Sequence, residues 1–149
     1  MNPDQLQALL TNVQQGTLAV PEALKQLRTL PYENLGFASL DHHRALRQGF
    51  PEVIFCEGKT VAQVVAIAKT LLRKNKALLA TRVEPSVAKA LVRLSKRATY
   101  HDDARVVAIA PPKLVRRGSV LIVTAGTADI PVAEEARVTA DIMGSKTDT

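Results

Sequence analysis

The chain has 149 residues, 46% of them apolar, which is enough for one ordinary domain or two small ones with a hydrophobic core. Its net charge of +6, from 20 basic and 14 acidic residues, suits anionic ligands such as nucleotides. The basic residues lack the dense clustering that is typical of nucleic-acid-binding domains.

The sequence also limits where the protein works. No apolar run approaches the roughly 20 residues that cross a membrane, and the first residues, MNPDQLQALL, lack the layout of a signal peptide. Cys56 is the only cysteine, which excludes an internal disulfide and fits a reducing compartment. It lies in an apolar segment, where we expect a small hydrophobic residue and no nucleophile. We therefore predict a cytoplasmic protein with neither a membrane nor a nucleic acid as partner.

The N-terminal stretch predicts a helical hairpin. Apolar residues at helical spacing indicate a helix over residues 3–14, which Gly16 ends. Val20 and Pro21 open a second helix, and Pro31 ends it. We interpret the hairpin as a docking or packing module.

The densest polar group follows a brief extended segment over residues 37–40 and reads Asp41-His42-His43-Arg44-Ala45-Leu46-Arg47. Arg44 and Arg47 lie one helical turn apart and are candidates for contact with an anion or a nucleotide. The alternative is a solvated helix start with Asp41 as its N-cap. Adjacent histidines on extended chain point to opposite faces, and no Cys or His partner has zinc-like spacing, so we expect no metal here.

A strand over residues 53–56 leads through a turn into a helix over residues 61–74, which Thr60 is expected to cap. The turn Gly58-Lys59-Thr60 resembles the end of a phosphate-binding P-loop. That motif requires a further glycine where this chain has Val53, so the motif is absent. Lys59 stays a candidate anion contact.

The next part of the chain alternates strands and helices. The sequence predicts a strand over 77–80, a helix from Glu84 to about Arg97, a loop around Tyr100-His101-Asp102-Asp103 and a strand over 105–110. Residues 1–110 are therefore predicted to form one small α/β domain. Residues 111–118, with two prolines and a glycine, are predicted to be a linker, and residues 119–149 begin a second domain.

The stretch from Ser119 to Met143 predicts one strand, one tight turn and one helix. Residues 120–123 form a continuous apolar run rich in β-branched residues, as expected for a strand buried on both faces. Gly126 ends the run, and Pro131 suits the first position of a helix. Exposed N–H groups at such a turn can hold a phosphate, with hydroxyl donors from Thr124 and Thr127. The alternative is an ordinary strand-to-helix turn with no ligand.

Two segments closely resemble the LarB family: ASLDHHRALRQGFPEVIFCEGKT at 38–60 and VLIVTAGTADIPVAEEARVTADIMG at 120–144. The second segment also resembles the opening of PurE-type aminoimidazole ribonucleotide carboxylases, whose domain the LarB family carries at its C-terminal end. The resemblance implies the fold class α/β: a small mixed α/β N-terminal domain, followed by the first βα unit of a flavodoxin-like (PurE-type) parallel-sheet domain.

The resemblance implies a carboxylase of nickel-pincer cofactor biosynthesis. The family carboxylates the pyridine ring of nicotinic acid adenine dinucleotide with carbon dioxide or bicarbonate and releases AMP. The product is the cofactor precursor pyridinium-3,5-biscarboxylic acid mononucleotide. No covalently bound cofactor is implied; Mg²⁺ is a candidate cofactor, and a homo-oligomer is a candidate assembly.

The resemblance also assigns site residues. In PurE-type domains the first βα turn holds the phosphoribosyl part of the substrate, a role that falls here on Gly126, Thr127 and Asp129, while Ala128 stands where those turns usually have Ser. The family's catalytic cysteine and most of its sheet lie beyond this turn. We therefore expect a truncated or frameshifted member with no catalytic residue, in which residues 119–149 are loosely held. The polar residues after Gly144 do not resemble the expected continuation toward the next strand.

Two alternatives stay open. The chain is a nucleotide- or subunit-binding module without catalysis, with Arg44, Arg47 and Lys59 as its anion contacts. Or it is a purine-pathway carboxylase of the PurE type, which explains residues 119–144 but gives no role to the motif at 38–60.

Overall fold

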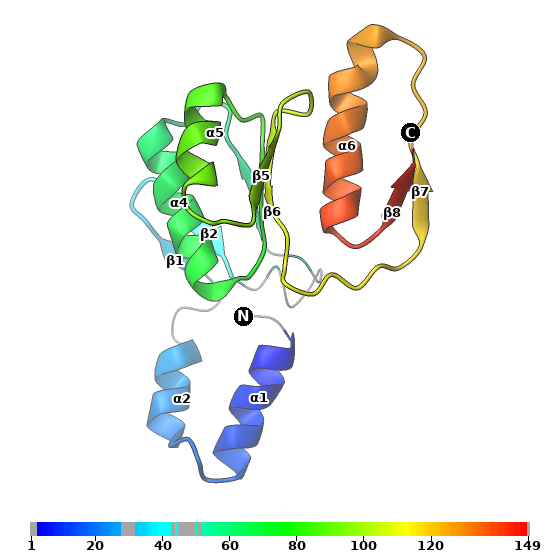
Figure 1. Cartoon of the computed structure of the whole chain (residues 1–149). Helices are drawn as coiled ribbons and strands as arrows, with labels where there is room; N and C mark the ends of the chain where they lie inside the picture. The colour runs from blue at the N-terminus through cyan, green and yellow to red at the C-terminus, as the bar shows by residue number, and fades with distance from the viewer. Residues whose placement is uncertain (1–2, 28–31, 43, 45–49, 51, 149) are drawn as a thin grey trace. The chain divides into compact units, whose positions relative to one another are not determined.

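The computed structural model describes residues 3–27, 32–42, 44, 50 and 52–148 (Figure 1). Its fold is mixed α/β, which confirms the predicted class. The chain divides into two compact units, residues 1–52 and 53–149. The predicted domains 1–110 and 119–149, joined by a linker at 111–118, stay a prediction.

The first unit contains a helical hairpin and a β-hairpin. Helices α1 (Pro3–Gln14) and α2 (Val20–Leu27) confirm the predicted hairpin, and they bury Leu9 and Ala23. Gly16 between them has a φ of +72°, a conformation that glycine adopts without steric cost. Strands β1 (Tyr32–Asn34) and β2 (Ser39–Asp41) pair antiparallel. The sequence indicated only the second strand.

The second unit is built on a four-stranded mixed sheet in the order β3-β4-β6-β5. The parallel pair is β3 (Val53–Phe55) and β4 (Leu78–Thr81), and the antiparallel hairpin is β5 (Ala98–His101) and β6 (Val106–Ile109). Every residue of β4 and β6 is buried. Figure 1 shows why: α4 (Val61–Lys74) and α5 (Pro85–Val92) lie on one side of the sheet, and α6 (Ile130–Ile142) lies on the other.

The predicted cap of α4 is confirmed. The Thr60 side chain accepts a hydrogen bond from the Gln63 N–H at 3.3 Å, and the Thr60 N–H donates to Gln63 Oε1 at 2.9 Å. This reciprocal arrangement is a capping box, which satisfies two backbone donors at the helix start.

Two details between α5 and β6 differ from the prediction. Helix α5 ends at Val92, whereas the sequence predicted about Arg97. The Arg97 guanidinium instead donates to the carbonyls of Lys76 and Ala110, so the chain after α5 follows the end of the sheet. Residues 98–101 form β5, where we expected a loop at Tyr100, because pairing with β6 satisfies their backbone groups.

The remaining segment forms a βαβ unit. Strand β7 (Ser119–Leu121) runs through a short 3₁₀ turn, η1 (Thr127–Asp129), into α6 and then into β8 (Lys146–Asp148), which pairs parallel with β7. Strand β8 lies in the polar residues after Gly144, where the sequence did not predict a strand. Helix α6 packs on the sheet through Val138 and Ile142, which are buried.

Residues 120–123 are not covered on both faces, although their composition is typical of such a strand. All three residues of β7 are exposed, and Val123 after it is 80% exposed. In the described residues β8 is the one strand that pairs with β7, and a strand needs neighbours on both sides and both faces to be buried. An apolar run therefore identified the strand but not its surroundings.

Candidate functional site

The turn between β7 and α6 holds the three residues that the resemblance assigns to phosphate and ribose. Gly126 precedes η1 with extended backbone, and its carbonyl accepts a hydrogen bond from the Asp129 N–H at 3.0 Å. Asp129 is the N-cap of α6, and its side chain makes no capping hydrogen bond. Gly126, Thr127 and Asp129 are all exposed, so ligands have access to them. Their binding roles stay a prediction.

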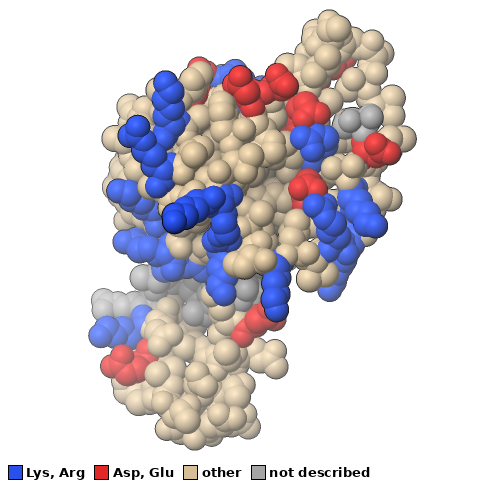
Figure 2. Space-filling view, viewed as in Figure 1, with Lys and Arg blue, Asp and Glu red and all other residues tan. Residues whose placement is uncertain are grey.

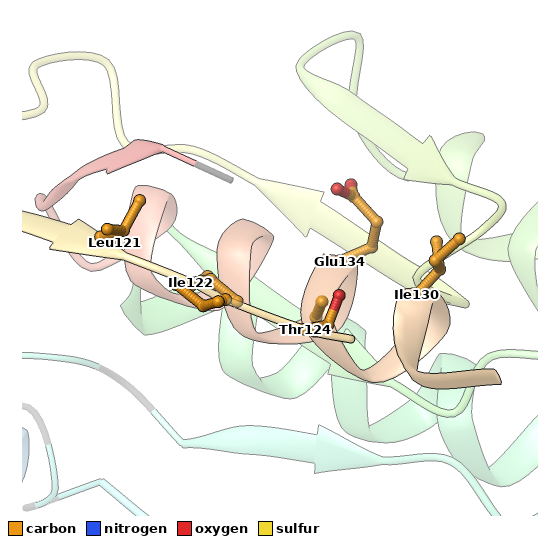
Figure 3. Close-up of a pocket in the computed structure, with 7 residues that line it drawn as sticks. Leu121, Ile122, Thr124, Ile130 and Glu134 are labelled. Carbon is orange, nitrogen blue, oxygen red and sulfur yellow. The ribbon is translucent and has the colours of Figure 1, made fainter. Parts of the chain in front are cut away.

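A groove of about 320 Å³ lies beside this turn (Figure 3). We call it the β7 groove, and its lining residues are Leu121, Ile122, Val123, Thr124, Ile130, Ala133 and Glu134. It therefore spans the carboxyl end of β7 and the first turns of α6. Its lining is mostly aliphatic, with the Thr124 hydroxyl and the Glu134 carboxylate as polar groups.

The carboxylate of Glu134 in the β7 groove is paired with an arginine on the same helix, α6. Arg137 Nε donates to both carboxylate oxygens of Glu134, at 3.1 and 2.9 Å. These hydrogen bonds raise the pKa of Arg137 above its ordinary value. Because the Glu134 charge is paired within the helix, it repels an incoming anion less than a free carboxylate does.

The three candidate anion contacts divide between the two units. Arg44 is half-buried in helical backbone in the first unit, and Arg47 lies outside the described residues. Lys59 belongs to the second unit, where its Nζ donates to the Phe55 carbonyl at 2.7 Å and lies 5.9 Å from the centre of the Phe55 ring. Lys59 thus stabilises the turn after β3. Whether these residues bind an anion stays a prediction.

Two arginines that the sequence did not single out have unusual backbone where they flank the two central strands of the sheet, β4 and β6. Arg82 follows β4 with a φ of +54°, and Arg105 precedes β6 with a φ of +51°. The Val83 N–H donates to the Arg105 carbonyl at 2.8 Å, which joins the two turns. Non-glycine residues rarely adopt this left-handed conformation, and such strain is concentrated at functional sites.

Both arginine side chains pair with carboxylates. Arg82 Nε lies 3.2 Å from Glu135 Oε2 on α6, and Arg105 forms an ion pair with Glu84, the N-cap of α5. The sequence does not indicate these positions, because left-handed backbone is predicted from glycine or asparagine and not from arginine.

The single thiol is unsuited to nucleophilic chemistry. Cys56 is buried, with its Sγ 3.8 Å from the Ile54 carbonyl oxygen. Burial raises the pKa of the Cys56 thiol to about 11, although the charge of Lys59 opposes that shift. Because the thiolate is the reactive form, Cys56 acts as the small hydrophobic residue that the sequence predicted.

The positive charge of the protein gathers away from the βα turn. Figure 2 shows Lys and Arg side chains over the part of the second unit where α4 and α5 lie. Helices α4 and α5 carry four basic residues, Lys69, Arg73, Lys74 and Lys89, and no acidic residue. This face favours long-range attraction of anions.

The described residues hold no group of three His, Cys, Asp or Glu side chains that could bind a metal ion. No helix among those residues is long and apolar enough to span a membrane.

The structure defines a mixed α/β protein with an exposed βα turn, and comparison with known families specifies it further. Residues 32–111 match the family model described as the LarB/PurE-like N-terminal domain, so the chain belongs to this family. The match includes the whole motif at 38–60, and it relates the protein to the carboxylases of this family.

A curated relative extends the similarity beyond that domain. The chain is 33% identical over 148 residues to an uncharacterized protein of Methanocaldococcus jannaschii. The match covers 93% of the present chain and 57% of the relative, so the chain spans little more than half the length of that protein.

Proposed function

We propose that this chain supplies the N-terminal domain and the first nucleotide-binding turn of a LarB-type carboxylase of nickel-pincer cofactor biosynthesis. The observation that carries the proposal is the family match over residues 32–111, followed in the same chain by an exposed βα turn. The substrate we propose is nicotinic acid adenine dinucleotide, with carbon dioxide or bicarbonate as the source of the new carboxyl group.

The role of this chain in that reaction is to bind and orient the nucleotide. The exposed N–H groups at the start of α6 and the Thr127 hydroxyl donate to a phosphate, and the Asp129 carboxylate accepts from a ribose hydroxyl. Since Cys56 is buried and its pKa is raised, the described residues offer no thiolate for covalent catalysis. We therefore expect this chain alone to release no AMP from the dinucleotide.

Titration with nicotinic acid adenine dinucleotide, followed by backbone NMR, tests the proposal. We expect the largest shifts at residues 124–130. Gly126→Ala is the sharpest variant, because Gly126 has an extended backbone and an added Cβ would meet nothing nearer than Asp129 Oδ2 at 3.6 Å. The variant should therefore fold normally, yet it should weaken binding about tenfold if a phosphate approaches the Gly126 backbone.

Ala128→Ser is the matched variant that should strengthen binding of the dinucleotide. It adds the hydroxyl that PurE-type turns usually carry, so binding should tighten by a few-fold if the turn holds the phosphate. Unchanged affinity in both variants would rule out the turn as the binding site.

The second candidate function is a binding module, favoured by the fact that the matched domain contains Arg44 and Lys59 but not the βα turn. In that case the Arg44→Ala, Arg47→Ala double variant should no longer bind nicotinic acid adenine dinucleotide, whereas Asp129→Ala should still bind it. The opposite pattern supports the carboxylase proposal.

A further inference from the structure

Two arginines lie opposite each other where the β4–β6 pair ends. In this antiparallel pair Ala80 lies opposite Val107. The same register, continued past the last paired residues, places Arg82 opposite Arg105. The hydrogen bond from the Val83 N–H to the Arg105 carbonyl, at 2.8 Å, shows that the two strand ends are still in contact there. Like charges directly opposite each other destabilise a pair of strands, so this placement is unfavourable for folding.

The backbone at both positions is unfavourable as well. In the part of the chain that the structure describes, Arg82 and Arg105 are the two non-glycine residues with positive φ. Glycine adopts this conformation without steric cost. The protein therefore has arginine at two adjacent positions where both the charge and the backbone favour another residue. Strain of this kind is concentrated at binding and catalytic sites.

Each guanidinium group is paired with a carboxylate from a different side of the sheet. Arg82 contacts Glu135 on α6, and Arg105 contacts Glu84 at the start of α5. Helices α5 and α6 lie on opposite sides of the sheet (Figure 1). The side chains of Arg105 and Glu84 are 46% and 64% exposed, and the other pair is partly exposed. Because exposed ion pairs are weak, a stronger anion can replace either carboxylate.

The spacing of the two arginines suits one shared anion. Opposite residues of an antiparallel pair have Cα atoms about 5 Å apart, so both guanidinium groups can reach a group beyond the strand ends. A phosphate presents more oxygens than a carboxylate does and can accept from two guanidinium groups at once. The present carboxylate partners occupy one arginine each.

We propose that Arg82 and Arg105 together bind the phosphate group of a soluble ligand, which displaces Glu135 and Glu84. Both arginines lie within the matched domain over residues 32–111. The site uses no residue of the βα turn and does not depend on the proposed function.

Titration with inorganic phosphate, followed by backbone NMR on the whole chain, tests the proposal. Chloride at equal ionic strength is the reference, because both salts screen charges equally. We expect saturable shifts at residues 82–84 and 104–106 with phosphate alone. Methyl phosphate should give the same shifts, since a monoester keeps the oxygens that arginine binds. Equal shifts with chloride, or no shifts, would overturn the proposal.

Variants separate binding from folding. Arg82→Gly and Arg105→Gly suit the left-handed backbone, so each should be at least as stable as the wild type yet bind phosphate about tenfold more weakly. Glu135→Gln should strengthen binding a few-fold, because it releases Arg82 from its ion pair. Arg93→Ala is the control, since it removes one positive charge at the other end of α5. Wild-type affinity in both glycine variants, or an equal loss in Arg93→Ala, would contradict the proposal.

Tyr100 gives a second readout beside Arg105. Burial, and then a hydrogen bond with Asp102, raise the pKa of Tyr100, whereas the charge of Arg105 lowers it. A phosphate bound to Arg105 offsets that charge, so it should raise the pKa of Tyr100 further. Tyr32→Phe leaves Tyr100 as the only tyrosine in a chain without tryptophan, so ultraviolet absorbance follows this one group. A pKa of Tyr100 that phosphate does not change would argue against binding at Arg105.

Gly126→Ala distinguishes this site from the βα turn. The variant should bind phosphate as the wild type does, whatever its effect on the dinucleotide. Loss of phosphate binding in Gly126→Ala, together with normal binding in the two glycine variants, would place the phosphate at the turn and overturn the present inference.

Discussion

Arg82 at the end of β4 and Glu135 on α6 form an ion pair, with Nε and Oε2 3.2 Å apart. The pair links the carboxyl end of a central strand of the four-stranded sheet to the helix that follows the candidate nucleotide turn. It therefore bears on how firmly the βαβ unit of β7, α6 and β8 is attached to that sheet.

A double-mutant cycle of Arg82→Ala and Glu135→Ala measures this link. Both side chains are partly exposed, 41% and 25%, so we expect a coupling energy of about 0.5 kcal/mol in urea unfolding. The coupling should fall at high salt. A salt-independent coupling would contradict an electrostatic origin.

Gly144→Ala should be strongly destabilising. Gly144 has a φ of +98°, and an added Cβ would lie 2.6 Å from the Val115 carbonyl oxygen. We expect a loss of about 2 kcal/mol or more in the free energy of unfolding. Gly16→Ala is the matched control, because Gly16 has a φ of +72° but open space around it. It should lose only about 1 kcal/mol.

Cys56 should react slowly with thiol reagents. The rate of alkylation in the folded protein should rise toward a midpoint near pH 11, against an ordinary thiol pKa of 9.0 in the unfolded chain. The folded state holds the proton more tightly, so the contribution of this group to stability is complete below pH 9 and is lost as the pH rises toward 11. A midpoint near 9 in the native protein would show that the thiol is accessible.

Acid should destabilise the folded protein through protonation of His101. Burial, and then the charge of Arg137, lower the pKa of His101 below its ordinary value of 6.5. The neutral form is favoured in the folded state, so stability is complete above pH 6.5 and falls as the pH drops through the lowered pKa. In His101→Gln, the urea midpoint of unfolding should depend less on pH below pH 6.5 than it does in the wild type. An unchanged pH dependence would assign the acid sensitivity to another group.

The sequence predicted the elements that carry their own signals. The helices at 3–14 and 61–74 have the predicted bounds, because apolar spacing, a capping threonine and terminating residues are all local. Strands β1 and β5 were missed because they are short and partly polar, and only their partners make them strands.

The same division applies to the candidate site. The turn at Gly126 was located from a strand run, a glycine and a following proline, which are local features. The exposure of Leu121 and the left-handed backbone at Arg82 and Arg105 depend on distant segments, and no residue type in the sequence indicates them.

The left-handed backbone at Arg82 and Arg105 also affects which substitutions a screen of variants would select. A library screened for thermal stability alone should replace Arg82 and Arg105 by glycine or asparagine, since each relieves backbone strain. A library screened for activity should keep arginine wherever the guanidinium is needed. The difference between the two selections would reveal which of these positions the protein holds at the expense of its own stability.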